Sequence, residues 1–268
     1  MQFNKKPITS VRIRDFIIRK MSFYWSFFNY SKFSMLLYLI QYPLRKFGLL
    51  KNGILFVEKR FIRCPEICIL DEIFFRNVYC RLKDFEPDER TLVIDAGANV
   101  GFFSLKHLTY GCDIIVIEPE SENFKLLTYN LKSYGKARFL EKALMKENGK
   151  ARILLSNSVT HTVVDSSTSR SAQNEAEVDA ISLDSLGDLI SKGQRVLLKI
   201  DIEGAELDAL RGGLSFIKKH NPLLMVETHS LEIEKSVDKL LVKECGYKRV
   251  NSVDMTEGGL VKVIYYYK

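Results

Sequence analysis

Residues 91–104, with the sequence TLVIDAGANVGFFS, constrain the fold of this chain more than any other stretch. Residues 92–94 form an apolar run of the length expected for a buried parallel strand. Asp95 ends that run, Gly97 and Gly101 follow, and a helical pattern begins directly afterwards. A strand that leads into a glycine-rich turn and then a helix predicts a cofactor site. Glycine lets the backbone approach a ligand closely, and a new helix points free N–H groups at it.

The residues around this turn favour a cationic cofactor. The glycine spacing matches neither the dinucleotide fingerprint nor the phosphate-binding loop. Asp95 would repel a pyrophosphate, but it suits S-adenosylmethionine, which carries a sulfonium and an ammonium group. Glu118 ends the next apolar run, 23 residues after Asp95, close to the offset of roughly 20 at which an acid reaches ribose hydroxyls. The two acids predict a nucleoside site, and a plain strand–turn–helix unit with solvated acids is the alternative.

The chain has 268 residues, enough to bury a full α/β core. Its five cysteines are scattered, and the spacing of Cys64 and Cys68 alone is a weak metal signal, so we expect reduced thiols. The N-terminus lacks the apolar core and small-residue cleavage site of a signal peptide. We therefore expect a cytoplasmic protein, with the membrane surface as a second location.

The positive charge is concentrated at the N-terminus. Residues 1–63 contain 13 Lys and Arg against 2 Asp and Glu, whereas the remainder contains 27 against 31. The most apolar stretch, residues 33–44, is 12 residues long, short of the roughly 20 that a membrane-spanning helix needs. A basic, aromatic segment over residues 1–50 can lie on an anionic membrane, or it can form a pair of helices that pack on the catalytic domain or on a partner subunit. Nucleic-acid binding is disfavoured because the basic residues alternate with large aliphatic ones.

The chain divides, on its sequence, into an N-terminal extension over residues 1–85 and a cofactor-binding domain over residues 86–268. The extension has strand-like segments at 53–57, 67–70 and 73–75. We expect the strand-like part to cover the cofactor pocket or to pack on the sheet edge. Strands and helices then alternate, which predicts a doubly wound, mostly parallel sheet with helices on both faces. The predicted strands are 92–94, 114–117, 137–140, 151–155, 178–183, 196–200, 222–227 and 262–267, and the predicted helices are 102–110, 121–134 (capped by Ser121), 184–190, 203–211 and 231–245.

Four acids come at the carboxyl ends of predicted strands. Ligands of such sheets bind at this edge. The sequence therefore predicts a row of carboxylates along one rim, made of Asp95, Glu118, Asp201 and Glu227.

With these motifs in view, the chain resembles the FkbM family of class I S-adenosylmethionine-dependent methyltransferases. The segment KIDIEGAE at residues 199–206 is the most specific part of the resemblance. The resemblance spans residues 91–229, about half of the chain, and leaves the N-terminal extension outside. The matching segments are 93–104, Glu118-Pro119 with Asn123 and Asn130, 182–186, 198–210 and 226–229.

The resemblance implies a seven-stranded Rossmann-like sheet ending in an antiparallel hairpin, preceded here by a helical and strand extension. It implies methyl transfer, commonly to a hydroxyl of a sugar, polyketide or related small molecule. Asp201 would lie near the sulfonium methyl, Glu118 with Pro119 would bind the ribose, and Ala143 would lie near the adenine. The methionine part would be lined by Gly97, Ala98, Asn99 and Gly101.

A hydroxyl acceptor must lose a proton, so a general base assists its methylation. The candidates, beside Asp201, are Glu203, Glu227, His229 and His161. Two of them have a plainer alternative: Glu203 could cap the following helix, and His229 could be a solvated loop residue. His161 lies in a polar loop. Lys199 could pair with the rim acids in a structural ion pair. A divalent ion held by Asp201, Glu203 and Glu227 is conceivable, but the sequence does not predict one.

We therefore expect a methyltransferase that acts on a hydroxyl of a glycan, glycolipid or secondary metabolite. One alternative is a non-catalytic protein that keeps the fold and uses its N-terminal extension for assembly or membrane association. A nicotinamide oxidoreductase is a weaker alternative, because Asp95 and the absent dinucleotide fingerprint argue against it.

Overall fold

The computed structural model describes residues 32–47, 50, 52–57, 60–65, 69, 71–155, 162–164, 175–255 and 259–268. It divides into two compact units, Met1–Arg76 and Asn77–Lys268. The boundary predicted after residue 85 falls inside the second unit. Among the helices described, none is long and apolar enough to cross a membrane.

The first unit contains a helix and a hairpin. Helix α2 (Lys32–Lys46) packs on the antiparallel strands β1 (Gly53–Val57) and β2 (Arg60–Cys64), in which Gly53 lies opposite Cys64. Residues 71–75, where the sequence suggested a strand at 73–75, form a short π-helical turn, η1 (Asp71–Phe75). That prediction was wrong because three consecutive apolar residues carry no period that separates a strand from a helix.

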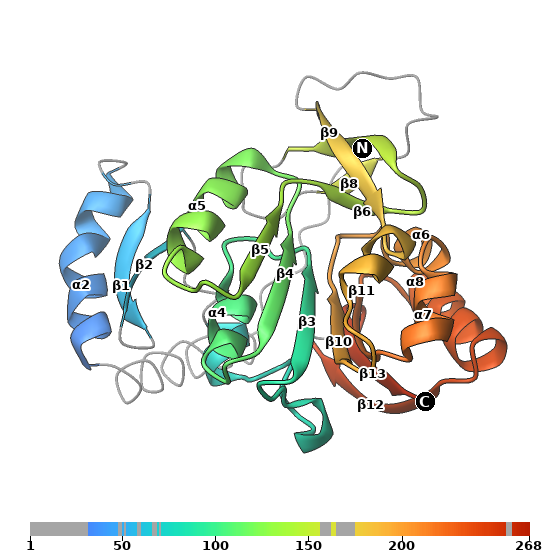
Figure 1. Ribbon diagram of the computed structural model, residues 1–268. Coiled ribbons are helices and arrows are strands. Elements are labelled where there is room, and N and C mark those ends of the chain that lie inside the picture. Colours follow the sequence, from blue (N-terminus) through green and yellow to red (C-terminus); the bar gives the residue numbers. More distant parts are fainter. Residues whose placement is uncertain are drawn as a thin grey trace, which may run out of the picture. The chain divides into compact units, whose positions relative to one another are not determined.

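The second unit is built on a seven-stranded sheet in the order β12-β13-β11-β10-β3-β4-β5 (Figure 1). Strands β11, β10, β3, β4 and β5 run parallel, and β13 pairs antiparallel with β11 and β12. The predicted doubly wound sheet with a final antiparallel hairpin is confirmed. The strands are β3 (Thr91–Ala96), β4 (Asp113–Ile117), β5 (Ala137–Leu140), β10 (Arg195–Ile200), β11 (Leu223–Thr228), β12 (Lys248–Asp254) and β13 (Lys262–Tyr267).

Alternation along the strands gives the sheet two different faces. Ile94, Leu198 and Val226 contribute to one large apolar core, which also takes in side chains of the helices that follow β10 and β11. Because neighbouring residues of a strand point to opposite faces, Asp95 and Lys199 project to the other side, where they are register partners on β3 and β10. Two charged side chains, Asp95 and Lys199, therefore lie side by side within the sheet.

Helices cover both faces. Helices α4 and α5 follow β3 and β4, and Figure 1 shows α6, α7 and α8 gathered beside β10 and β11. Helix α5 is capped by Glu120, whose carboxylate accepts hydrogen bonds from the Glu122 and Asn123 amides, so the predicted cap at Ser121 was wrong by one residue. The helical segments are α4 (Phe102–Leu108), α5 (Ser121–Leu131), α6 (Glu206–Arg211), α7 (Leu214–His220), α8 (Leu231–Asp238), its π-helical continuation η4 (Lys239–Glu244), and the 3-10 turns η2 (Lys83–Phe85) and η3 (Asp184–Leu189).

A second, four-stranded sheet follows β5 in the chain. Its order is β6-β9-β7-β8, and β6 pairs parallel with β9. Strand β6 starts three residues after β5 ends, so this sheet begins near the carboxyl edge of the main sheet (Figure 1). Its strands are β6 (Ala143–Met145), β7 (Gly149–Leu154), β8 (Thr162–Val164) and β9 (Glu175–Ser182).

Candidate active site

The glycine turn after β3 fits closely against the end of β10. Gly97 has φ +73, and a Cβ there would lie 1.7 Å from the main-chain oxygen of Asp201, so no other residue fits. The Gly97 amide donates to the carbonyl of Ile117 on the other side. Gly101 also has a positive φ, +86, where α4 begins. The turn is thus fixed between β4 and β10.

Asp95 supports this turn from inside the domain. Its carboxylate is completely buried, accepts a 2.7 Å hydrogen bond from the Ser104 hydroxyl, and lies 3.2 Å from the Lys199 ammonium. The ammonium also donates to the carbonyl of Gly97 at 2.7 Å. Burial alone would lower the pKa of Lys199, but Asp95 and Asp201 outweigh it and raise that pKa. The predicted ion pair of Lys199 is present, and a direct contact between Asp95 and a cofactor stays a prediction.

Glu118 joins the turn to the start of α5. One carboxylate oxygen accepts from the Asn99 amide at 2.8 Å, and the other accepts from the Glu120 amide at 3.1 Å. The side chain is only 5% exposed, and burial raises the pKa of its carboxyl to about 7. Pro119 is half-buried beside it. The Glu118 carboxyl group therefore lies at the end of β4, as the strand pattern predicted.

The two alanines predicted near the cofactor are buried. Ala98 donates its amide to the carbonyl of Ile117, within the turn. Ala143 lies on β6, where its side chain packs with Ala151 and Ala180 in the core of the small sheet. Contacts of Ala98, Ala143 and Pro119 with a cofactor stay predictions.

Three carboxylates from the ends of β10 and β11 surround one histidine. The Nε2 atom of His229 lies 3.3 Å from Glu203, 3.7 Å from Glu227 and 3.8 Å from Asp201. Four of the five predicted catalytic residues therefore meet at one point. The fifth, His161, lies outside the described residues.

The other ring nitrogen of His229 contacts a residue to which sequence reasoning gave no role. Glu206 is completely buried, and its Oε1 atom lies 3.1 Å from His229 Nδ1. Burial alone would lower the pKa of His229, but the hydrogen bond to Glu206 and the charge of Asp201 raise it to about 10. His229 is therefore an imidazolium at neutral pH. The only sequence signal for Glu206 was its place in the motif KIDIEGAE.

Glu203 has an unusual backbone conformation. Its φ is +54, in the left-handed region that non-glycine residues avoid, and Gly204 follows with φ +109. Burial and the neighbouring charge of Asp201 raise the pKa of the Glu203 carboxyl. Strain of this kind is common where a side chain must be aimed into a site.

Tyr79 completes the cluster from a segment distant in sequence. Its hydroxyl donates a hydrogen bond to Glu227 and lies 3.2 Å from Oδ2 of Asp201. Tyr265 on β13 holds this segment in place, because its hydroxyl donates to the carbonyl of Val78. No motif marks Tyr79 in the sequence, although the segment before residue 85 was expected to cover the pocket.

The cluster has a surplus of negative charge. With every carboxylate ionised, five acids face two cations, Lys199 and the imidazolium of His229. Ligand atoms of Asp201, Glu227 and His229 lie within 4.8 Å of one another, so these three side chains could hold a metal ion. The site is suited to a cationic ligand. Its five acids are Asp95, Asp201, Glu203, Glu206 and Glu227.

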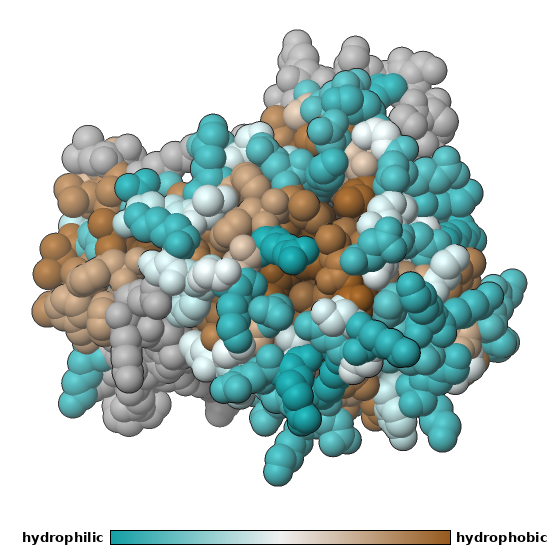
Figure 2. Space-filling view, in the orientation of Figure 1, coloured by the Kyte–Doolittle hydropathy of each residue, from teal (hydrophilic) through white to brown (hydrophobic). Residues whose placement is uncertain are grey.

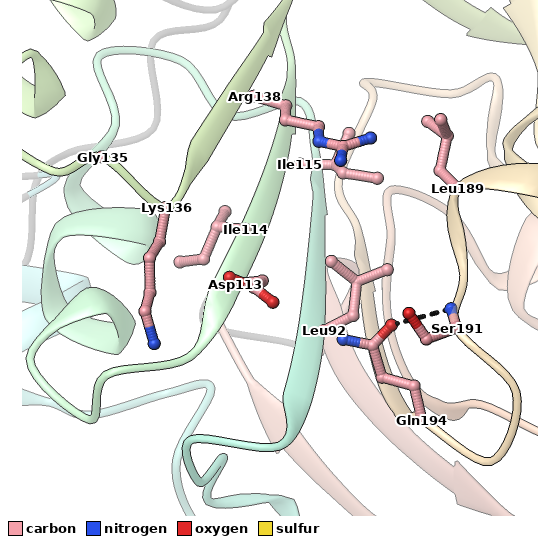
Figure 3. A pocket seen from close by; sticks show the side chains of 10 residues that line it. All are labelled: Leu92, Asp113, Ile114, Ile115, Gly135, Lys136, Arg138, Leu189, Ser191 and Gln194. Carbon is pink, nitrogen blue, oxygen red and sulfur yellow. Dashed lines mark hydrogen bonds between the residues drawn. The ribbon is translucent and has the colours of Figure 1, made fainter.

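A separate pocket of about 230 Å³ lies at the opposite edge of the sheet (Figure 3). Leu92 and Asp113, at the amino ends of β3 and β4, line it, as does exposed Arg138 on β5. Within it, the Ser191 amide donates to the side-chain oxygen of Gln194. Because the carboxylates lie at the other ends of the same strands, this pocket is not part of the candidate active site.

The strand order, the terminal antiparallel hairpin and the glycine turn beside an acidic strand end define a class I methyltransferase fold. The chain belongs to the FkbM methyltransferase family: the family profile described as the methyltransferase FkbM domain matches residues 95–249, more than half of its length. The chain therefore has the family and the fold of methyltransferases, which disfavours the nicotinamide oxidoreductase.

A solved structure agrees with this fold. A methyltransferase FkbM from Methylobacillus flagellatus KT aligns with a TM-score of 0.52 at 18% identity, covering 94% of this chain and 60% of that one. The chain thus spans about 60% of the length of that relative. Two structures align more weakly. A precorrin-6y C5,15-methyltransferase from Geobacter metallireducens GS-15 has a TM-score of 0.41 at 12% identity, covering 69% of this chain and 83% of that one. M. jannaschii TYW2 in complex with AdoMet has a TM-score of 0.43 at 11% identity, covering 81% of this chain and 87% of that one. No curated protein sequence matches the chain significantly.

Proposed function

We propose that the chain transfers a methyl group from S-adenosylmethionine to a hydroxyl of a glycan, a lipid-linked glycan or a secondary metabolite. The observation that carries the proposal is the joining of the two halves of the site: the Gly97 turn touches the main chain of Asp201. The cofactor turn and the carboxylate cluster are therefore neighbours, as a reaction between a bound cofactor and an acceptor requires.

The residues of the site fit such a cofactor. Gly97 leaves no Cβ between the turn and the cluster, and the surplus of carboxylates complements a ligand with a sulfonium and an ammonium group. Glu118 offers an almost buried carboxylate at the end of β4 for ribose hydroxyls. Asp95 acts indirectly in this proposal, by holding Lys199 beneath the turn.

S-adenosylmethionine supplies an electrophilic methyl group, and the acceptor hydroxyl gives up its proton to the protein. In the ligand-free site His229 already carries a proton and cannot accept one, which leaves the carboxylates. Among them Glu203 has a raised pKa, is 29% exposed, and sits beside the imidazolium. We assign Glu203 as the general base. We assign to His229, Glu206 and Glu227 the roles of orienting its carboxylate and balancing its charge.

Titration calorimetry with S-adenosylmethionine tests the cofactor half of the proposal. We expect micromolar binding by the wild type and binding at least about tenfold weaker for Glu118→Gln, the loss of one charge-assisted contact. Glu122→Gln is the matched control, because Glu122 lies on the first turn of α5, where its exposed carboxylate forms an ion pair with exposed Lys125. A folded wild type that does not bind the cofactor would favour the non-catalytic alternative.

The acceptor half is tested with radiolabelled cofactor and extracts of glycans, lipid-linked glycans and secondary metabolites. Glu203→Gln should bind the cofactor normally and transfer no methyl group. A labelled product that survives mild alkali and is identified as an O-methyl ether by mass spectrometry is the result expected for a hydroxyl acceptor. An alkali-labile product would be a methyl ester and would contradict the proposed acceptor class.

A further inference from the structure

Helix α2 presents its apolar side outward. Phe33, Leu36, Ile40 and Leu44 recur at three- and four-residue spacing, so they form one stripe along the helix. All four are exposed, and Ile40 is 60% exposed. Every exposed residue between 33 and 44 whose side chain the structure describes is apolar or aromatic. Figure 2 shows this as a hydrophobic patch over α2.

Two uncharged polar residues of the same helix, Ser34 and Gln41, face the hairpin. Ser34 is buried and exchanges hydrogen bonds with the main chain of Phe56 on β1. Gln41 donates to the carbonyl of Ile54 at 2.9 Å and accepts from its amide at 2.8 Å. The hairpin thus holds the helix by its polar side. An ordinary surface helix has the reverse arrangement, so the outward stripe calls for an apolar surrounding.

The charge of the N-terminal residues indicates which kind of surface contacts the stripe. Helix α2 contains three basic residues and no acidic one, and residues 1–63 contain 13 basic residues against 2 acidic ones. A second copy of this unit would bring like charges together, and residues 1–31, with six basic residues and one acid, carry the same sign. An anionic lipid surface satisfies both properties, because its headgroups attract the basic residues and its acyl boundary accepts the apolar stripe.

We propose that α2 binds the surface of anionic membranes, with the stripe of Phe33, Leu36, Ile40 and Leu44 inserted at the headgroup boundary. Aromatic side chains are suited to this depth, and Phe33 packs edge-to-face with Phe56 and Phe61 at one end of the stripe. Through this contact the first unit attaches the methyltransferase to the lipid surface. The proposal concerns the first unit alone and does not depend on the acceptor.

Vesicle flotation of the full-length protein tests the proposal. The probes are vesicles of phosphatidylcholine with 30% phosphatidylglycerol and vesicles of pure phosphatidylcholine, each in 50 mM and 500 mM NaCl. We expect flotation with the anionic vesicles at low salt, and a bound fraction reduced severalfold at high salt or with neutral vesicles. A wild type that floats with neither vesicle at either salt overturns the proposal.

The stripe itself is tested by substitution. Leu36→Gln/Ile40→Gln/Leu44→Gln should lower the partition coefficient at least tenfold. The matched control is Leu154→Gln/Leu189→Gln/Leu260→Gln, three exposed leucines of the second unit, which should float like the wild type. Unchanged thermal melting of both variants shows that they are folded. Undiminished flotation of the stripe variant overturns the proposal, as does a wild-type dimer in light scattering that this variant converts to a monomer without any lipid binding.

Discussion

The hydroxyl of Tyr79 donates a hydrogen bond to the carboxylate of Glu227, although 148 residues separate them in the sequence. Tyr79 is 4% exposed, and its hydroxyl also lies 3.2 Å from Asp201. One phenol therefore restrains two of the carboxylates that face His229. Its place at the site depends on Tyr265, which holds the backbone at Val78.

We expect Tyr79→Phe to lower kcat about tenfold to a hundredfold while leaving cofactor affinity within about twofold, because it loosens the cluster and leaves the glycine turn intact. The buried Glu227 loses a donor, so the free energy of unfolding should fall by about 1–3 kcal/mol. Steady-state kinetics and chemical denaturation measure both effects. Tyr267→Phe, at the exposed end of β13, is the control. An unchanged kcat would show that Tyr79 only fills space.

We expect Glu203 to lower the free energy of unfolding while it contributes to activity. Its left-handed φ of +54 costs a non-glycine residue roughly 1 kcal/mol. Glu203→Gly should therefore keep or raise the free energy of unfolding, by up to about 1 kcal/mol, and should lower methyl transfer at least about a hundredfold.

The control for Glu203 is Asn221→Gly, because Asn221 has φ +45 at the exposed end of α7. It should gain similar stability and keep full activity. Thermal melts and transfer assays compare the two. A Glu203→Gly variant that unfolds more easily than wild type would contradict the strain argument.

The ligand-free protein should lose stability as Glu118 ionises. Burial raises the pKa of this carboxyl from 4.5 to about 7, so the folded state binds more protons than the unfolded state between these values. The contribution is complete below pH 4.5 and is lost as the pH rises through 7, by roughly 3 kcal/mol at most. Denaturation at pH 5 and pH 8 should show a larger drop in the wild type than in Glu118→Gln.

The same carboxyl should make cofactor binding depend on pH. Ribose hydroxyls donate to an ionised carboxylate, so the affinity of the wild type should increase as the pH rises through about 7. Glu118→Gln should show a flatter profile. Calorimetry at pH 6 and pH 8 gives the comparison, and parallel profiles in the two proteins would argue against a contact between Glu118 and the ribose.

Gly97 and Gly193 offer a matched pair for the fit of the turn. Their φ values are +73 and +75, but a Cβ at Gly97 meets the Asp201 carbonyl whereas a Cβ at Gly193 meets nothing within 4 Å. Gly193→Ala should cost only about 1–2 kcal/mol of stability. Gly97→Ala should cost clearly more and abolish cofactor binding. Equal costs in denaturation experiments would show that the turn can move away from Asp201.

The acids at strand ends were predictable because parallel strands place their carboxyl ends on one edge. This rule places Asp201 and Glu227 at one site, and the short spacing in sequence adds Glu203 and His229 to it. The fold was predictable for a similar reason, since strong apolar runs alternate with helical periods.

Other features depend on tertiary packing and leave little local signal. Tyr79 reaches the site only because the chain before β3 crosses the sheet and is fixed by Tyr265. Glu206 lies on a helix face, and nothing nearby in sequence shows that His229 will approach it. Strand β12 was missed because its polar, half-exposed residues at the sheet edge do not form an apolar run.

The contact between Gly97 and Asp201 has a consequence for how the proposed active site can change in evolution. Because the glycine turn and Asp201, the residue directly after β10, meet through main-chain atoms, their separation is set by the backbone alone. Side chains elsewhere around the site can then be exchanged without altering the distance between donor and reaction centre. For the proposed methyl transfer, this arrangement would keep the reaction geometry fixed while the acceptor could change.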